Sequence, residues 1–446
     1  MDLNFQVIQE TEIHEFVAPK TKSKNSVSTK EARQTLKVLS LFSGCGGMDL
    51  GFEGGFKVFA KSINPKLQAH FIAKKIGAEI LLKRTRFETV FANDILPDAK
   101  KAWVNYFSKR GRDPLSFNSN SIVDLVKYYR QDLNVFPENI DVVTGGFPCQ
   151  DFSVAGKRNG FKSHKDHNGK AWNHNYASEE TRGKLYMWMK EVIEITKPKI
   201  FVAENVKGLV NLSNVKDIIQ ADFASAGYFV LNPQVLHAAD YGVPQSRERV
   251  IFIGIRKDAL NSLAVKELTK SIIGEKYNPY PKPSHAFNTQ GKDLCKPVML
   301  KDFFKHVPEP SDSNDLSQKY FSKAKYMGKH CQGQTEIKLE GIAPTIRAEH
   351  HGNIEFRRLS KKHGGKISEE LNKGLKERRL TPRECAIAQT FPMDYEFVIP
   401  NPSGRTGSFL VSPSMAYKII GNAVPPLLGY NIAKRLEEVW DLYFKK

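Results

Sequence analysis

The sequence predicts an α/β protein with a doubly wound, Rossmann-like sheet and a second domain that is smaller and less regular. The chain has 446 residues, more than the ~250–300 at which a single core stops growing, so we expect two domains. From residue 36 to 255, short apolar runs typical of strands alternate with helical patterns, which indicates parallel βαβ units. After residue 256 prolines, glycines and charges become frequent, which favours a separate, irregular domain.

The elements are expected in the following order. Residues 1–35 are polar and basic, and we expect a disordered tail. Residues 36–255 form the first domain, with strands at KVLSLF, TVFAND, DVVTGGF, KIFVAENV, FVLNPQVL and RVIFIGI. VFAKSIN at 58 resembles VFANDIL at 90, but only the second carries a carboxylate, so we place the second strand at 89–95 and an inserted helical segment at 66–86. Residues 256–407 form the second domain, and 408–446 return as helix to the first.

Charge and cysteine content narrow the class of protein. Lys and Arg number 67 against 48 Asp and Glu, a net charge of +19, which favours a polyanionic partner such as nucleic acid. The five cysteines are odd in number and form no CxxC pair, so we expect no disulfide framework and no metal site, as suits a reducing cytosol. We expect neither a secretory signal nor a membrane span.

The stretch LSLFSGCGGMDLGF follows the first expected strand and should open a helix. Such a loop presents backbone N–H groups to an anionic ligand group. A dinucleotide fingerprint would need glycine where Asp49 stands, which weakens an NAD site and favours S-adenosylmethionine, with Phe42 facing the adenine. Asp94, at the end of the next strand, is then placed to bind the ribose hydroxyls. A tight strand-to-helix turn without a ligand is the alternative.

Cys149 follows the strand in DVVTGGFPCQ, at the sheet edge where open α/β folds bind ligands. A free cysteine is most often a small buried hydrophobe. At this edge, however, its thiolate could attack an electron-poor carbon. The glycine-bearing, basic segment 155–176 that follows is expected to close over a phosphate backbone.

Two further strands bring polar groups to the same region. KIFVAENV ends with Glu204, an acid able to hydrogen-bond a ring nitrogen, although a solvated strand cap is the alternative. In QSRER, Arg247 and Arg249 occupy alternate positions and should project to one face, where they could hold a carbonyl oxygen or a phosphate. A solvated charged face is the alternative there.

Taken together, LFSGCGG, GGFPCQDFSVAG, ENVKGL, QSRER, RRLTPRECAIAQTFP and IIGNAVPP resemble, in order, the motifs of the DNA (cytosine-5) methyltransferases. The resemblance covers about 220 contiguous residues of the first domain and the last 70. It implies an S-adenosylmethionine-dependent methyltransferase fold in which Cys149 adds to C6 of a flipped cytosine while Glu204 engages N3. Arg249 would contact the cytosine O2, and Arg247 would support the loop or a phosphate.

The resemblance also implies the other site residues. Cofactor contacts are expected from Phe42, Ser43, Gly44, Gly46, Gly47, Asp94, Ile95, Ser121, Ile122, Pro148, Asn422 and Ala423. DNA contacts are expected from Gln150, Ser153, Lys157, Arg158 and Arg347, the last within a stretch, GIAPTIRAEHHGNIEFRRLS, suited to base edges and phosphates. Ser121 stands where the family usually has an acidic residue.

The resemblance implies a bacterial, cytoplasmic, monomeric enzyme that methylates cytosine in specific double-stranded DNA sequences and associates with the nucleoid through DNA. By analogy with the family alone, we expect it to belong to a restriction-modification system with a separate endonuclease. Three alternatives stay open. A tRNA cytosine-5 methyltransferase shares the Pro-Cys motif, and a catalytically silent DNA-binding module could share the scaffold. An NAD oxidoreductase is disfavoured by Asp49.

Overall fold

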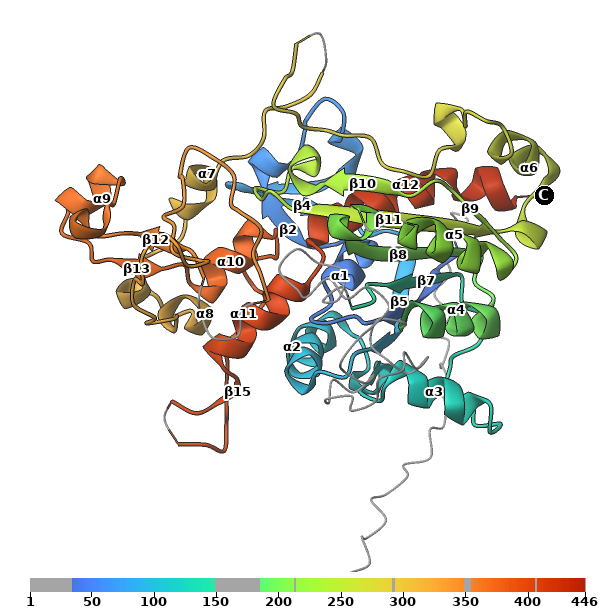
Figure 1. Ribbon diagram of the computed structural model, residues 1–446, viewed down its shortest axis with the longest axis horizontal. Coiled ribbons are helices and arrows are strands. Elements are labelled where there is room, and N and C mark those ends of the chain that lie inside the picture. The colour runs from blue at the N-terminus through green and yellow to red at the C-terminus, as the bar shows by residue number, and fades with distance from the viewer. Residues whose placement is uncertain are drawn as a thin grey trace, which may run out of the picture.

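The computed structural model describes residues 34–148, 185–211, 214–290, 293–348, 354–405 and 407–445. Its centre is an eight-stranded sheet (Figure 1). Across the sheet the strands are β10 (Gln234–His237), β11 (Glu248–Arg256), β8 (Ile200–Val206), β7 (Val142–Gly145), β1 (Leu36–Leu41), β5 (Phe87–Asn93) and β6 (Phe117–Asn118), with β9 (Tyr228–Val230) paired to β11. Five of the six apolar runs expected as strands are confirmed, and the sixth, FVLNPQVL, forms two short strands, β9 and β10, separated by residues 231–233.

Helices cover both faces of this sheet. Alternate residues of β8 enter two different cores: Ile200 and Val202 lie in one, Phe201 and Ala203 in the other. The first core is closed by α1 (Gly47–Glu53), α2 (Pro97–Phe107) and α12 (Pro426–Phe444), and the second by α3 (Ile122–Tyr129), α4 (Leu185–Thr196) and α5 (Val215–Ser225). This three-layer arrangement confirms the predicted α/β fold class.

The direction of the last strands differs from the expected parallel arrangement. β1, β5, β6, β7 and β8 are parallel to one another, whereas β11 runs antiparallel to β8, and β9 and β10 run antiparallel to β11. The sheet is therefore mixed. As a result, the start of β11 lies beside the end of β8, and Arg249 pairs in register with Val206.

The segment 66–86 is not helical as expected. It contains a single 3₁₀ turn (Ala69–Phe71) and then a hairpin, β3 (Ile72–Ile76) and β4 (Glu79–Leu82), turned at Gly77 with φ 58°. β4 also pairs with β2 (Lys57–Phe59), which completes a small antiparallel sheet. Short runs on either side of a glycine in the left-handed region are typical of a hairpin, and this signal outweighs the basic composition.

The less regular part of the chain lies to the left of the sheet in Figure 1. It contains α7 (Leu300–Phe304), α8 (Leu316–Lys319), β12 (Phe356–Arg358), α9 (Ser368–Asn372), β13 (Arg378–Arg379), α10 (Pro382–Ala388), β14 (Ile399–Pro400) and β15 (Phe409–Val411). Before it, α6 (Ser262–Leu268) lies on α12, where Asn261 N–H donates to the Tyr443 carbonyl at 2.9 Å. The chain after Ile255 thus first runs along the sheet domain, and the division at residue 255 stays a prediction.

The C-terminal segment returns to the first domain. α11 (Pro413–Asn422) ends at a Pro-Pro break, and α12 then packs along α1. In α1, a Cβ at Gly51 would lie 2.6 Å from the Pro426 carbonyl oxygen, so only glycine permits this close approach. Among the described residues no helix is long and apolar enough to cross a membrane.

Candidate active site

The glycine loop joins β1 to α1 through an unusual backbone. Phe42, Gly44 and Gly46 all have positive φ, at 53°, 55° and 79°. For Phe42 this is a strained conformation, of the kind that gathers at ligand sites. Gly46 N–H donates to the Ser43 carbonyl at 2.9 Å, which closes the turn from strand to helix. A Cβ at Gly44 would meet no atom within 4 Å, so the loop presents open backbone there.

Asp94 follows β5 directly and faces this loop. Its Oδ2 accepts a hydrogen bond from Gly44 N–H at 2.9 Å, and its Oδ1 accepts one from Leu96 N–H at 2.9 Å. Burial raises the pKa of Asp94 even though these two bonds act against the rise. The neighbouring Ile95 side chain is 37% exposed, an apolar surface beside a fixed carboxyl group. The structure thus brings the predicted loop and the predicted ribose-binding residue together.

The end of α11 covers the same loop from the other side. A Cβ at Gly47 would collide with the Val424 carbonyl oxygen and lie 3.3 Å from the Ala423 Cβ. Cys45 Sγ donates to the Ile419 carbonyl at 3.4 Å. Asn422 is exposed at this junction. Because the two segments are about 380 residues apart in sequence, only the fold brings them into one site.

Ser121 and Ile122 serve the start of α3. Ser121 Oγ accepts the N–H of Val123 at 3.3 Å, as an N-cap residue does, and its side chain is buried. Ile122 is 2% exposed and lies in the second core. Asn93 fastens the preceding turn by donating to the carbonyls of Asn118 and Asn120. Contact of Ser121 and Ile122 with a cofactor stays a prediction.

Glu204 and Arg249 form a buried ion pair at the meeting point of β8 and β11. Arg249 Nε lies 2.6 Å from Glu204 Oε1, and the side chains are 11% and 10% exposed. The other carboxyl oxygen, Oε2, would lie 2.9 Å from a Cβ at Gly146. Since Arg249 holds Oε1, the Oε2 atom is the one beside the turn that leads into Cys149.

The approach to Cys149 is fastened from β8 as well. Asn205, which follows Glu204, donates from Nδ2 to the Phe147 carbonyl at 3.1 Å. This bond fixes the residue before Pro148, at the end of the described segment. The carboxyl ends of β7 and β8 therefore hold the acid and the entry to the Pro-Cys motif side by side.

A family model described as C-5 cytosine-specific DNA methylase matches residues 75–438. The chain belongs to this family. Type II methyltransferase M.BsuRI of Bacillus subtilis is 31% identical over 405 residues, which span 89% of this chain and 78% of that protein. Type II methyltransferase M.HpaII of Haemophilus parainfluenzae is 32% identical over 326 residues, or 69% of this chain and 75% of that protein.

Solved structures agree on the fold of the methylase. A mutant of Spodoptera frugiperda DNMT2 superposes with a TM-score of 0.51 at 18% identity, covering 91% of this chain and all of that chain. The Dnmt2 methyltransferase of S. pombe gives a TM-score of 0.50 at 16% identity, covering 90% and 98%. At such identities the likeness concerns the fold alone.

Arg247 and Arg249, which were expected to project to one face, have different partners. Its guanidinium is 1% exposed and donates to the carbonyls of Ile346 and Gly421 at 3.1 and 3.0 Å. In this methylase Arg247 therefore joins the sheet to the second domain and to α11, and a catalytic role for Arg247 stays a prediction. Gln245 makes a similar connection, because its Oε1 accepts the Ile346 N–H and its Nε2 donates to the Ala388 carbonyl.

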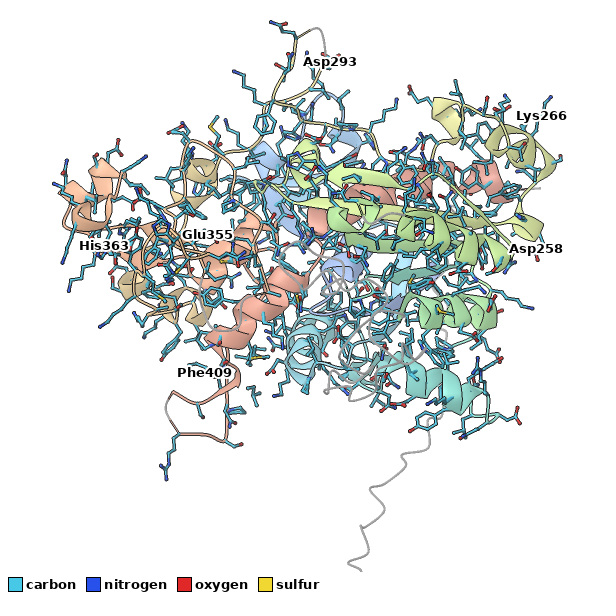
Figure 2. The ribbon with its side chains drawn as sticks, in the orientation of Figure 1. Asp258, Lys266, Asp293, Glu355, His363 and Phe409 are labelled. Carbon is cyan, nitrogen blue, oxygen red and sulfur yellow. The ribbon has the colours of Figure 1, made fainter. Side chains whose placement is uncertain are left out.

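The basic stretch expected to read DNA is largely engaged inside the second domain. Arg347 Nη1 donates to Glu355 Oε1 at 2.8 Å, and Figure 2 shows Glu355 within this domain. Arg357 and Arg358 are 5% and 1% exposed and pair with Glu370. Arg357 and Arg358 are therefore engaged inside the domain, because buried charges must be paired internally, and DNA contact by Arg347 stays a prediction.

The predicted nucleophile and its neighbours lie outside the described residues. This applies to the segment 155–176 and to Cys149, Gln150, Ser153, Lys157 and Arg158.

The described residues contain no group of three or more His, Cys, Asp or Glu side chains that could hold a metal ion.

Sequence reasoning missed two residues of the site. Asn205 stands beside Glu204 at the end of the predicted strand but was given no role, although an amide after the strand-end acid is well placed to bond a neighbouring loop. Asp49 was noted only as an obstacle to a dinucleotide fingerprint. In the structure it is a buried carboxyl directly behind the glycine loop, and burial raises its pKa to about 7.

Proposed function

We propose that this methylase transfers a methyl group from S-adenosylmethionine to C5 of cytosine within a specific, short sequence of double-stranded DNA. The observation that carries the proposal is the buried Glu204–Arg249 pair, whose Oε2 lies against the turn leading to Cys149. The named type II relatives support sequence-specific modification within a restriction-modification system. We infer a separate endonuclease as the partner from this context alone.

The donor set at the glycine loop fits this cofactor. Open backbone at Gly44, the fixed Asp94 carboxyl and the apolar Ile95 offer polar and apolar contacts to a nucleoside. Asn422 and Ala423 would complete the site from α11. When bound, S-adenosylmethionine supplies an electrophilic methyl group.

The chain's own residues account for the rest of the chemistry. The target base must leave the stack, because its C6 cannot be reached within the duplex. The Cys149 thiolate adds to C6, and the C5–C6 π electrons shift toward C5 while Glu204 provides a proton at N3. Arg249 orients Glu204 and faces the cytosine O2. Once C5 has taken the methyl group that S-adenosylmethionine would supply, loss of the C5 proton to a base returns an electron pair that restores the C5–C6 double bond and expels the thiolate, and the N3 proton returns to Glu204.

The test combines methyl transfer with mapping. Purified protein is incubated with labelled S-adenosylmethionine and unmethylated genomic duplex, and 5-methylcytosine is mapped at single-base resolution. We expect methylation confined to one short sequence. Cys149→Ser should abolish turnover and leave duplex binding within about twofold, because a hydroxyl is a far weaker nucleophile at C6.

Cys331 supplies the matched control, since it is an exposed free cysteine in the second domain. Cys331→Ser should methylate at the wild-type rate. Appreciable methylation by Cys149→Ser would refute the nucleophile. Methylation of tRNA in place of duplex DNA, or duplex binding without turnover in the wild type, would replace the proposed substrate or activity.

A further inference from the structure

Asp49, in the first turn of α1, is 1% exposed and lies behind the glycine loop. Each of its carboxyl oxygens accepts one hydrogen bond. Ser40 Oγ donates to Oδ1 at 2.5 Å, and Trp103 Nε1 donates to Oδ2 at 2.7 Å. The two donors come from β1, which leads into the loop, and from α2, which packs against Gly46, so Asp49 connects both elements to α1.

The bond to Ser40 continues toward Asp94. Ser43 Oγ donates to Ser40 Oγ at 2.9 Å and accepts the Asn93 N–H at 3.1 Å. Ser43 N–H in turn donates to the Asn93 carbonyl at 2.8 Å. The next residue is Asp94, which accepts the N–H of Gly44. This chain of bonds fixes the glycine loop relative to the carboxyl group proposed to bind the ribose.

The bond to Trp103 supports the other half of the loop. A Cβ at Gly46 would lie 2.6 Å from Trp103 Cδ1, so the indole ring lies directly against the backbone of Gly46. The ring stacks on Phe107, with centroids 4.4 Å apart and an interplanar angle of 12°. The hydrogen bond from Nε1 to Asp49 sets the rotation of the ring, and hence the position of the surface on which Gly46 packs.

Burying a carboxyl group at position 49 costs free energy. One turn further along α1, the buried Glu53 is compensated by Arg112 at 2.9 Å and Arg110 at 3.7 Å. Among the described residues no Lys or Arg lies within ion-pair distance of Asp49. The titratable groups that act on it or respond to it are Glu53, Cys45 and Tyr395. Local costs of this kind are expected where a residue serves function.

We propose that Asp49 is a positioning residue for cofactor binding, which holds the glycine loop through Ser40 and Ser43 on one side and through Trp103 on the other. The inference rests on the proposed function, because it takes the glycine loop and Asp94 as the cofactor site. It assigns Asp49 no contact with the cofactor and no part in proton transfer.

The measurement is calorimetric titration of the full-length protein with S-adenosylhomocysteine, alongside steady-state kinetics in S-adenosylmethionine and DNA. Asp49→Ala should raise the Kd and the KM for the cofactor about tenfold, the equivalent of one lost hydrogen bond. The KM for DNA and kcat should change less than about twofold. Asp49→Asn should bind nearly normally, since its amide can accept from Trp103 and donate to Ser40.

Three further variants separate positioning from general stability. Glu53→Gln removes a buried carboxylate from the same helix without touching the hydrogen bonds of Asp49, so it should lower Tm and leave cofactor affinity unchanged. Ser40→Ala interrupts one side of the network. Trp103→Phe keeps an aromatic ring under Gly46 but removes the donor. Each should weaken cofactor binding and spare the KM for DNA.

The outcomes distinguish this inference from the proposed function. If Asp49→Ala weakens cofactor binding no more than Glu53→Gln, or if Ser40→Ala and Trp103→Phe both bind normally, the positioning role is overturned and the proposed function stands. If the wild-type protein binds no S-adenosylhomocysteine, the proposed cofactor is overturned and the role of Asp49 with it.

Discussion

Arg247 and Arg249 are two positions apart at the start of β11, and their guanidinium groups meet different partners. Arg249 pairs with Glu204, whereas Arg247 is bonded to two backbone carbonyls contributed by the second domain and α11. Both are buried, so a substitution at either position leaves buried acceptors without a donor. A substitution of Arg249 should nevertheless change the rate of catalysis, whereas a substitution of Arg247 should change the stability of the protein.

Arg249→Ala should lower kcat at least 100-fold while cofactor affinity is kept, because Glu204 loses the group that orients it and the site loses a preorganised charge. Arg249→Lys should recover only part of this rate, since an ammonium cannot reproduce the planar guanidinium geometry.

Arg247→Ala should instead lower the free energy of unfolding by about 3 kcal/mol, as expected for lost charged hydrogen bonds. Single-turnover kinetics measures the effect of the Arg249 variants, and urea unfolding measures the effect of Arg247→Ala. A normal free energy of unfolding for Arg247→Ala would contradict its structural role.

At the residue scale, the sequence predicted those groups whose position follows from strand ends. Asp94 and Glu204 terminate apolar runs, and parallel strands bring their carboxyl ends to one edge. The roles of Arg247 and Arg347 depend on partners brought close only by the fold: Ile346 and Gly421 for Arg247, and Glu355 for Arg347. A basic residue on an expected surface and a basic residue in a buried pair look the same in one sequence.

At the scale of elements, strand direction was the main feature that periodicity could not predict. After Arg249 the run VIFIGI is apolar, as a buried strand such as β11 requires, but its pattern is the same for either direction. The hairpin β3–β4 was misassigned because its lysines were given more weight than Gly77. β3 is an edge strand and carries Lys74 and Lys75 exposed, a composition that discourages further strand pairing.

The pairing of β12 with β13 is short, and ion pairs between side chains do more than the strand pairing to hold this region together. Glu309 accepts from Arg358 Nη1 at 3.0 Å and from Arg378 Nε at 3.0 Å, and Glu384 accepts from Arg378 at 2.8 Å. Burial alone would raise the pKa of Glu309, but the two guanidinium groups lower it to about 2. These contacts join the segment before α8 to both strands.

The lowered pKa fixes the sign of a pH effect. Glu309 adds stability above the pKa of an unfolded glutamate, near 4.5, and loses it as the pH falls through about 2. Glu309→Gln should therefore destabilise the protein at pH 7 and flatten the decline in stability between pH 4.5 and 2. Urea unfolding at several pH values tests this, with the exposed Glu369→Gln as control. Equal pH profiles for wild type and Glu309→Gln would argue against the ion pairs.

For the whole molecule, the basic residues that give the net charge of +19 are not equally accessible to a binding partner. Arg357, Arg358 and Arg378 are buried in ion pairs of the second domain, and Arg347 is bonded to Glu355. Figure 2 shows His363 toward the outer end of that domain, where it pairs with Glu377. Among the described residues of that domain, lysines carry much of the exposed positive charge, among them Lys361, Lys362, Lys366, Lys373 and Lys376.

Duplex affinity should consequently depend steeply on salt, because each neutralised phosphate releases condensed counterions. For six or more phosphate contacts, affinity falls at least about 1,000-fold between 50 and 200 mM salt.

Lys157→Ala and Arg158→Ala should each reduce the slope of log Kd against log salt by about one, if the loop after Cys149 contacts phosphates. Arg347→Ala serves as the comparison, since its guanidinium is already paired with Glu355 and should leave the slope unchanged. Fluorescence anisotropy across a salt series gives all four slopes. A flat response in the wild type would mean that the surplus charge does not face the DNA, whereas a reduced slope for Arg347→Ala would show that its ion pair opens when the duplex binds.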